Sequence, residues 1–426
     1  MFNRIKGTKD ILDLTLFNFL IEKVKKHLSI YNFIQIETPI LEPLELYNRS
    51  LGLETDIVSK EMYVIKSNSD DSEKETICLR PEGTASTVRA FVENNIESTP
   101  WKVFSYGPMF RHERPQKGRY RQFNQVNIEV IGSKSINQDV QLIKMLERFF
   151  LDLLDIDNYG LLINFIGCDQ DRIKFKDIFK EFLESIIDNI CNTCKIRKDT
   201  NILRVFDCKN NTCKEIYKTA PKITDYLCDI CKHEWSELKN NLEHLSVSYS
   251  HDPNLVRGLD YYQKTVFEFV SPNLGAQNAF CGGGRYDKLV KEIGGHKDQP
   301  SVGAAIGIER ILLLLQTMKD KLSIPAKPDL YVILPLSTQE QDIALLLCDE
   351  IQAALSDKNM SKNISVDIFL EGDSLKSMMR RANKLEAKFA IIIGSTEKQD
   401  KTVSLKDMTT GQEQKISQAD LIKYII

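Results

Sequence analysis

The chain has 426 residues, which is too long for a single hydrophobic core and predicts two or three domains. Its 42% hydrophobic and 27% charged residues are typical of a soluble globular protein, and a net charge of −3 is compatible with local basic patches. No apolar run reaches the ~18 residues of a membrane span, and the first residues lack the apolar core of a secretory signal. We therefore expect a cytoplasmic protein that does not enter a membrane.

Two helices are predicted in the first hundred residues. Apolar residues recur at helical spacing over 14–31, and residues 33–39 read as a strand that ends at a proline. A second helix is predicted over 85–94, directly after Glu82 and Thr84. Carboxylates and hydroxyls at a helix N-terminus commonly cap it, so this pair alone indicates a helix start.

Residues 106–132 predict two antiparallel strands joined by a basic loop. Side chains alternate between the faces of a strand, so Val126, Ile128 and Val130 fall on one face and are expected in the core. The opposite face carries a cation, an aromatic ring, two amides and a carboxylate: Arg121, Phe123, Gln125, Asn127 and Glu129. Such a row suits a ligand pocket, although a hairpin with one solvated face shows the same alternation.

The run FRHERPQKGRYRQF at 110–123 resembles motif 2 of the class II aminoacyl-tRNA synthetases, and in detail the histidyl-tRNA synthetase family. The resemblance extends to RGLDYY at 257–262, FCGGGRYD at 280–287 and VGAAIGIER at 302–310. The strand at 33–39 fits motif 1, which lies in the dimer interface of that family. The resemblance covers nearly the whole chain, and it implies a class II fold.

This resemblance implies roles for individual residues. Three cations are expected to be catalytic, because they would meet the charge of the reacting phosphates: Arg111, Arg257 and Arg310. The residues expected to bind histidine are Glu82, Gly83, Thr84, Arg111, Gln125, Glu129, Arg257, Tyr261 and Tyr262. Those expected to bind ATP are Arg111, Glu113, Arg121, Phe123 and Arg310. Those expected to contact tRNA are Arg114, Gln116 and Arg121.

Two of these expectations are geometric. The guanidinium groups must converge on one nucleotide triphosphate, with Arg257 bridging the reacting carboxylate and the α-phosphate. Glu129 and Tyr262 must meet the imidazole ring, as a carboxylate and a phenol that can hold its two nitrogens. The chain departs from the family pattern at Asn124, where many relatives have His, and at Asn127, where some have Gly.

Residues 169–245 are rich in Lys, Asp, Asn and Cys, and we interpret them as an insertion in a catalytic domain of residues 1–324. The resemblance implies that an insertion at this place contacts the tRNA acceptor arm. It contains six cysteines in closely spaced pairs: Cys191, Cys194, Cys208, Cys213, Cys228 and Cys231. In a reducing compartment they either bind zinc or pack as small apolar side chains. We therefore assign no metal ligand from the sequence.

A short linker at 325–328 precedes residues 329–426, where strands and helices alternate and predict a small α/β domain. It resembles the anticodon-binding domain of the same synthetase group. The predicted fold is thus a multidomain α+β and α/β protein. It combines a class II antiparallel-sheet core, an inserted domain and a C-terminal α/β anticodon-binding domain.

The implied reaction is the ATP-dependent ligation of L-histidine to tRNA(His) through a histidyl-adenylate, releasing AMP and pyrophosphate. Mg²⁺ would accompany ATP, and the partners would be tRNA(His) and a second copy of the chain in a homodimer. Two other classes of protein would share these motifs. One is a non-catalytic regulatory paralogue that senses histidine for ATP phosphoribosyltransferase, and the other is an RNA-binding protein with an inactive synthetase core.

Overall fold

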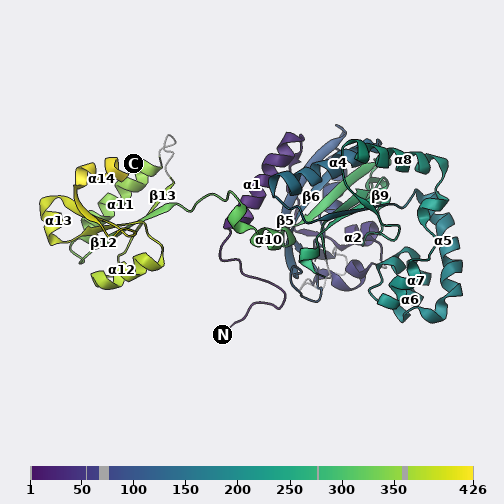
Figure 1. Ribbon diagram of the computed structural model, residues 1–426, viewed down its shortest axis with the longest axis horizontal. Coiled ribbons are helices and arrows are strands. Elements are labelled where there is room, and N and C mark those ends of the chain that lie inside the picture. The colour runs from purple at the N-terminus through teal and green to yellow at the C-terminus, as the bar shows by residue number, and fades with distance from the viewer. Residues whose placement is uncertain (1, 54, 67–75, 276–277, 357–362, 426) are drawn as a thin grey trace. The chain divides into compact units, whose positions relative to one another are not determined.

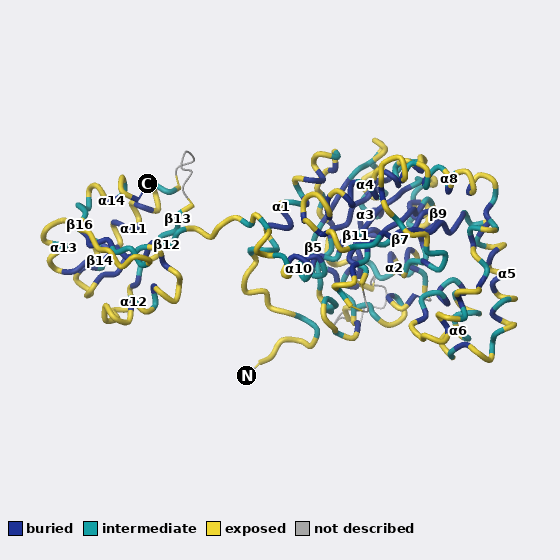
Figure 2. The backbone as a smooth tube through the Cα atoms, viewed as in Figure 1, coloured by how far each residue is buried: buried dark blue, intermediate teal, exposed yellow. Residues whose placement is uncertain are grey.

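The structure is a computed structural model that describes residues 2–53, 55–66, 76–275, 278–356 and 363–425. The chain divides into two compact units, Met1–Ile324 and Pro325–Ile426, and each has its own extended sheet (Figure 1). In both units the buried residues, drawn dark blue in Figure 2, concentrate along the strands and the helix faces beside them. In the described part of the chain, no helix is both long and apolar enough to cross a membrane.

The larger unit is built on an eight-stranded sheet with the strand order β1-β5-β6-β11-β10-β9-β7-β8. Six consecutive strands of that order are paired antiparallel: β5 (Trp101–Phe110), β6 (Gln122–Ile131), β11 (Ser301–Gly307), β10 (Ala279–Arg285), β9 (Gln263–Val270) and β7 (Gly160–Phe165). The outer strands pair in parallel with their neighbours: β1 (Ile34–Gln35) with β5, and β8 (Ser250–His251) with β7. The antiparallel core predicted from the sequence is confirmed.

Helices cover both faces of this sheet. One face is packed by α1 (Thr15–Ile30), α4 (Asn137–Arg148), α8 (Asp229–His244) and α10 (Ile308–Gln316). The core they enclose includes Val126, Ile128 and Val130, as the alternation on β6 predicts. The other face is packed by α2 (Leu44–Leu51), α3 (Thr84–Glu93) and α9 (Leu289–Glu292). A small sheet lies with them: β2 (Leu41–Pro43), β4 (Ile77–Leu79) and β3 (Tyr63–Ile65).

Between β7 and β8 the chain leaves the sheet and forms a helical segment, coloured teal in Figure 1. Besides α8, it contains α5 (Asp169–Ser185), α6 (Asn192–Thr200) and α7 (Asn211–Tyr217). Short 3₁₀ turns connect them: η3 (Ile187–Asn189), η4 (Ile202–Asp207) and η5 (Ile223–Tyr226). Stacked rings hold the segment together, and the ring centroids of Phe179 and Phe206 lie 4.5 Å apart. These helices occupy the stretch whose composition suggested an insertion.

The smaller unit has a five-stranded sheet with the order β13-β12-β14-β15-β16. Its strands are β12 (Asp329–Pro335), β13 (Ile364–Ile368), β14 (Phe389–Ile393), β15 (Thr402–Asp407) and β16 (Glu413–Ser417). The first three are parallel, and β15 and β16 are antiparallel to their neighbours. Its helices are α11 (Gln341–Leu355), α12 (Leu375–Lys384), α13 (Ser395–Asp400) and α14 (Gln418–Ile425). The alternating α/β pattern is confirmed.

A buried ion pair fixes the end of β10. Arg285 is 1% exposed and its partner Asp139, on α4, is 0% exposed. The guanidinium donates hydrogen bonds to Asp139, to Asp287 at 3.2 Å, and to the carbonyl oxygens of Ser133 and Ser135 at 2.8 and 2.9 Å. A buried charge compensated this fully makes the loss of either partner costly.

Arg285→Met is expected to lower the free energy of unfolding of the larger unit by about 3–5 kcal/mol, because it leaves the Asp139 carboxylate buried without a cation. Arg49→Met is the matched control, since Arg49 is exposed in a surface ion pair and its loss should cost less than ~1 kcal/mol. Both tryptophans, Trp101 and Trp235, lie in the larger unit, so urea unfolding followed by tryptophan fluorescence reports on this unit alone. Equal costs for the two variants would contradict the prediction.

Candidate active site

A cavity of about 570 Å³ lies beside the polar face of β6. Arg111 reaches it from the end of β5, Arg257 from the segment before β9, and Arg310 from the first turn of α10. Three segments that are far apart in the sequence therefore bring guanidinium groups to one cavity. Five carboxylates from the same unit also line it: Asp56, Glu113, Asp207, Glu268 and Glu309.

Arg257 is positioned by an acid and an aromatic ring, and a glycine on the neighbouring strand leaves space for it. Its guanidinium pairs with Glu268 on β9 and lies 5.8 Å from the centroid of the Tyr262 ring. A Cβ at Gly282 would lie 2.4 Å from Nη1 of Arg257, so a larger residue there would displace this guanidinium. Burial disfavours the charged form, but the nearby Glu268 carboxylate outweighs it and raises the pKa of Arg257. The group is a permanent cation at the cavity wall.

The other two arginines are anchored by backbone carbonyl groups. Arg111 Nε donates to the carbonyl oxygen of Pro81 at 2.9 Å, and its guanidinium lies 5.4 Å from the centroid of the Phe123 ring. Arg310 donates to the carbonyl oxygen of Ala279. Burial lowers the pKa of Arg310, which means that the folded chain disfavours its positive charge. An anion in the cavity would relieve that cost.

Farther along the same face of β6, a buried polar network surrounds Glu129. Thr84 Oγ1 donates to one carboxyl oxygen at 2.7 Å, and the hydroxyl of Tyr286 donates to the other. A Cβ at Gly303 on β11 would lie 1.7 Å from Oε2, so the carboxyl occupies space that only glycine provides. Burial raises the pKa of Glu129 to about 8. Glu129 is 1% exposed and does not itself line the cavity.

Glu82 and the two tyrosines complete this network. The Glu82 carboxylate accepts the backbone N–H groups of Thr84 and Ala85 at 2.7 and 2.8 Å, so it caps α3 as the sequence alone indicated. It also accepts the hydroxyl of Tyr261 at 3.5 Å. The Tyr261 and Tyr262 ring centroids are 4.5 Å apart, and burial raises the pKa of Tyr262 to about 12. Each carboxylate oxygen has two lone pairs, so capping leaves Glu82 able to accept a further donor.

Two amides lie between the cavity and Glu129 on the same strand. Among the described residues, Gln125 Oε1 and both polar side-chain atoms of Asn127 are buried without a hydrogen-bond partner. Leaving a buried amide unsatisfied costs ~1–3 kcal/mol, which is typical of a site that a ligand completes. Gln125 lines the cavity, and Asn127 lies against Gly83. A ligand that reached from the cavity toward Glu129 would pass both amides.

Some of the predicted residues lie outside this arrangement. Arg114 and Gln116 are exposed on the loop between β5 and β6. Arg121 is half-buried, and its Nε donates to the carbonyl oxygen of Glu113 at 3.3 Å. Arg121 is not among the residues that line the cavity. The structure thus separates these loop positions from the cavity and from the network around Glu129.

Three residues that hold the site together were assigned no role from the sequence: Glu268, Tyr286 and Glu309. Tyr286 and Glu309 do lie within the motifs at 280–287 and 302–310. Glu309 accepts hydrogen bonds from the backbone N–H and the side-chain amide of Asn124, each at 2.9 Å, and so ties α10 to β6. The insertion also contributes three unforeseen cations to the cavity wall: Arg197, Lys209 and Lys214. These residues contact segments that are distant in the sequence, so no short-range pattern predicts the contacts.

The free energy of unfolding should depend on pH through Glu129. Its pKa rises from 4.5 to about 8 on folding, so between these values the folded chain holds a proton that the unfolded chain has lost. This contribution to stability is complete below pH 4.5 and is lost as the pH rises to about 8. Over this range, wild-type stability should fall by about 1.4 kcal/mol per pH unit more than that of Glu129→Gln. Urea unfolding at several pH values measures this difference, with the exposed Asp320→Asn as the control. Parallel curves for wild type and Glu129→Gln would contradict it.

The geometry can be compared with known proteins. A family model described as histidyl-tRNA synthetase matches residues 18–311, and one described as an anticodon binding domain matches residues 331–426. The histidine–tRNA ligase of Thermosipho melanesiensis is 42% identical over 420 residues, which cover 97% of this chain and 96% of that protein. The histidine–tRNA ligase of Clostridioides difficile is 37% identical over 422 residues, covering 98% and 97% of the two chains.

Solved structures agree with these matches. The crystal structure of apo S. aureus histidyl-tRNA synthetase is 31% identical, covers 100% of this chain and 99% of its own, and superposes with a TM-score of 0.78. A Bacillus halodurans structure described as an ATP phosphoribosyltransferase regulatory subunit/histidyl-tRNA synthetase has a TM-score of 0.62 at 18% identity, a likeness of fold alone. The chain therefore belongs to the histidyl-tRNA synthetase family.

Proposed function

We propose that this chain ligates L-histidine to tRNA(His) at the expense of ATP, with residues 1–324 as the catalytic domain. Family membership supports the reaction. The observation that carries the site is the single cavity lined by Arg111, Arg257 and Arg310, next to the buried carboxyl of Glu129. In this proposal residues 325–328 are a linker, and residues 329–426 bind the anticodon.

The reaction has two steps. A carboxylate oxygen of histidine attacks the α-phosphorus of ATP, the bond from that phosphorus to the bridging oxygen breaks, and pyrophosphate leaves. A terminal ribose hydroxyl of the tRNA then attacks the acyl carbon of the histidyl-adenylate, loses its proton, and AMP leaves. Neither step needs a covalent bond to the protein, so catalysis rests on positioning and on cations at the phosphates.

In our assignment, ATP occupies the cavity as its Mg²⁺ complex. Arg257 bridges the reacting carboxylate and the α-phosphate, and Arg111 holds the same phosphate. Phe123 and Arg310 enclose the adenine ring, and the Arg310 guanidinium also reaches the γ-phosphate. The aromatic rings beside Arg111 and Arg257 support this assignment, because contact with Phe123 and Tyr262 holds the two planar guanidinium groups at the cavity wall. Glu113, which pairs with Arg111, orients that cation.

Histidine occupies the row from Gln125 to Glu129. Glu82 accepts its α-ammonium group, and Gln125 supplies one of the amide atoms that lack a partner in the described chain. Glu129 and Tyr262 read the imidazole ring. Both Glu129 oxygens already accept hydroxyl groups, so an imidazole N–H uses a remaining lone pair or displaces one of these donors.

Contacts with tRNA are assigned to three parts of the chain. The exposed Arg114 and Gln116, together with Arg121, meet the 5′ end of the acceptor stem, while the insertion lies near the 3′ end. Arg197, Lys209 and Lys214 support the latter assignment, because they add positive charge to the cavity wall that a polynucleotide end would approach. The anticodon contacts the α/β domain, whose family model carries that description.

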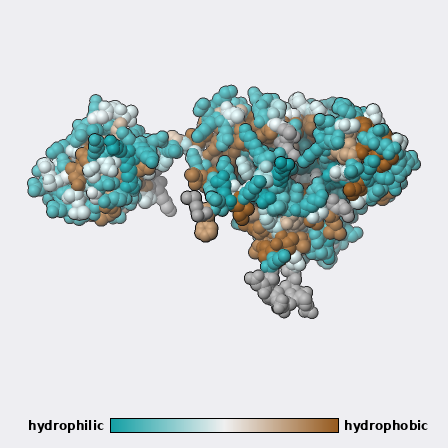
Figure 3. Space-filling view, turned by 90° about the horizontal axis from the view of Figure 1, so that it is seen from below, coloured by the Kyte–Doolittle hydropathy of each residue, from teal (hydrophilic) through white to brown (hydrophobic). Residues whose placement is uncertain are grey.

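A homodimer is also part of the proposal. Apolar side chains gather in brown areas of the surface in Figure 3. The short strands β1 to β4 carry exposed apolar residues that a monomer would leave in water: Ile34, Leu41, Val64, Ile65 and Ile77. These include the strand that resembles motif 1. Sedimentation equilibrium tests this point, and a monomer at micromolar concentration would contradict it.

Histidine-dependent exchange of pyrophosphate into ATP tests the proposed reaction. Arg257→Gln and Arg310→Gln are each expected to lower kcat/KM for exchange by ~10²–10³-fold, because each removes a cation from the phosphates. Arg148→Gln, an exposed arginine on α4, is the control and should exchange like the wild type. Exchange that does not depend on histidine would refute the proposal. So would its complete absence from the folded wild-type chain, as expected of a regulatory paralogue or a plain RNA-binding protein.

Arg114→Ala separates tRNA contact from the chemistry at ATP. Because Arg114 is exposed on the loop, the variant is expected to keep pyrophosphate exchange and to lose about tenfold in kcat/KM for charging tRNA(His). The loss should shrink as salt is raised, since it arises from a phosphate contact. Equal losses in exchange and charging would show that Arg114 acts at the ATP site instead.

A further inference from the structure

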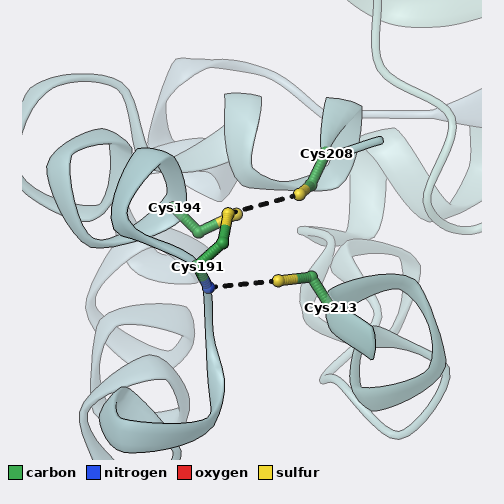
Figure 4. A group of neighbouring side chains, drawn as sticks. All are labelled: Cys191, Cys194, Cys208 and Cys213. Atoms are coloured by element: carbon green, nitrogen blue, oxygen red, sulfur yellow. Dashed lines mark hydrogen bonds between the residues drawn. The ribbon is translucent and has the colours of Figure 1, made fainter. Parts of the chain in front are cut away.

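Cys191, Cys194, Cys208 and Cys213 meet at one point of the insertion, and we call them the four-cysteine cluster (Figure 4). Their Sγ atoms all lie within 4.8 Å of one another. Three of the side chains are buried, and Cys191 is partly exposed. The fold thus joins two cysteine pairs that the sequence presents separately.

Helix ends bring these side chains together. Cys191 immediately precedes α6 and Cys194 lies on its first turn, while Cys208 follows η4 and Cys213 lies on α7. Backbone N–H groups point at two of the sulfur atoms: that of Cys191 donates to Cys213 Sγ at 3.3 Å, and that of Asn210 to Cys208 Sγ at 3.4 Å. Hydrogen bonds of this kind favour a thiolate and orient it as a metal ligand.

The spacing of the sulfur atoms fits one tetrahedral ion. Zinc–thiolate bonds of about 2.3 Å give a tetrahedron whose edges are about 3.8 Å. The Sγ atoms of Cys191 and Cys208 are 3.7 Å apart. A disulfide would require about 2.05 Å. An iron–sulfur cluster divides its thiolates among several iron atoms and so separates them more widely than a single ion does.

We propose that the four-cysteine cluster binds one structural Zn²⁺ ion. Four thiolates are soft ligands that suit zinc, and a closed set of four protein ligands is typical of a structural site rather than a catalytic one. The elements concerned need such support, because α6 and α7 are only 9 and 7 residues long, and helices of this length are marginal alone.

The ion would also position part of the active-site wall. Cys208 itself lines the large cavity, next to Lys209, and α6 and α7 supply Arg197 and Lys214. Fixing α6 to α7 through one metal therefore fixes these three cations relative to each other. Metal binding itself does not rest on the proposed ligase reaction.

A second group, at the start and end of the insertion, serves as an internal comparison. Cys168, Asp171, Cys228 and Cys231 also lie within 4.8 Å of one another. There the carboxylate of Asp171 accepts the backbone N–H groups of Cys228 and Cys168 at 2.8 and 3.2 Å, so it already has a capping role. This group offers only three thiolates, so the proposal is confined to the four-cysteine cluster.

The test is the metal content of the full-length chain, measured by plasma mass spectrometry after purification without chelators. The wild-type chain is expected to carry zinc. Cys194→Ser and Cys213→Ser are each expected to lose about one zinc per chain relative to the wild type. Cys348→Ser, a buried cysteine of the smaller unit, is the matched control and should lose none. Unchanged zinc in both cluster variants, or loss only from Cys231→Ser, would overturn the proposal.

Two further measurements decide the matter if the serine variants fail to fold. Cys191→His keeps a Cys₃His set that zinc accepts, so it should retain metal, and its Co²⁺-substituted form should show weaker sulfur-to-cobalt absorption than the wild type. In the unaltered chain, chelation should expose four additional thiols to an aromatic disulfide reagent, and zinc should protect them again. A reduced wild-type chain that takes up neither Zn²⁺ nor Co²⁺ would refute the site. These readouts involve neither histidine nor ATP, so they fail independently of the exchange assay.

Discussion

The active site depends on two glycines, whose lack of a side chain leaves space for neighbouring groups. Gly282 on β10 leaves the space filled by the guanidinium of Arg257, and Gly303 on β11 leaves the space filled by the carboxyl of Glu129. A Cβ at either position would overlap those atoms, so the bare backbone admits a half-buried guanidinium and a buried carboxyl beside the central strands. Each group is then held by hydrogen bonds or an ion pair, because an isolated buried charge would be unstable.

Several cations of the cavity are paired with carboxylates of the protein itself. Arg257 pairs with Glu268, and Glu113 pairs with both Arg111 and Arg119. The negative charges of these acids reduce the repulsion between the guanidinium groups. Several guanidinium groups can therefore face the same cavity. Cations fixed in advance need little reorganisation when phosphate charge develops, and this is the arrangement from which electrostatic catalysis gains most.

Patterns of short range were readable from the sequence. The alternation along β6 predicted which side chains enter the core, and the helical spacing before Tyr31 predicted α1, because both depend only on the period of one element. The order of strands and helices after residue 329 predicted the α/β unit for the same reason. Family motifs selected Arg111, Arg257 and Arg310, which line one cavity. The strand expected at 33–39 is shorter than predicted, since only Ile34–Gln35 pairs with β5.

The sequence by itself therefore predicted most of the helices and strands, because each depends on a short-range pattern. Only the tertiary structure decided which side chains meet: Glu268 with Arg257, Tyr286 with Glu129, and two cysteine pairs with each other. It also decided that Glu129 lies in a buried network and not at the cavity surface. The physical reason is that these contacts join segments brought together by strand pairing and helix packing, and local periodicity carries no information about which distant segments will pack side by side.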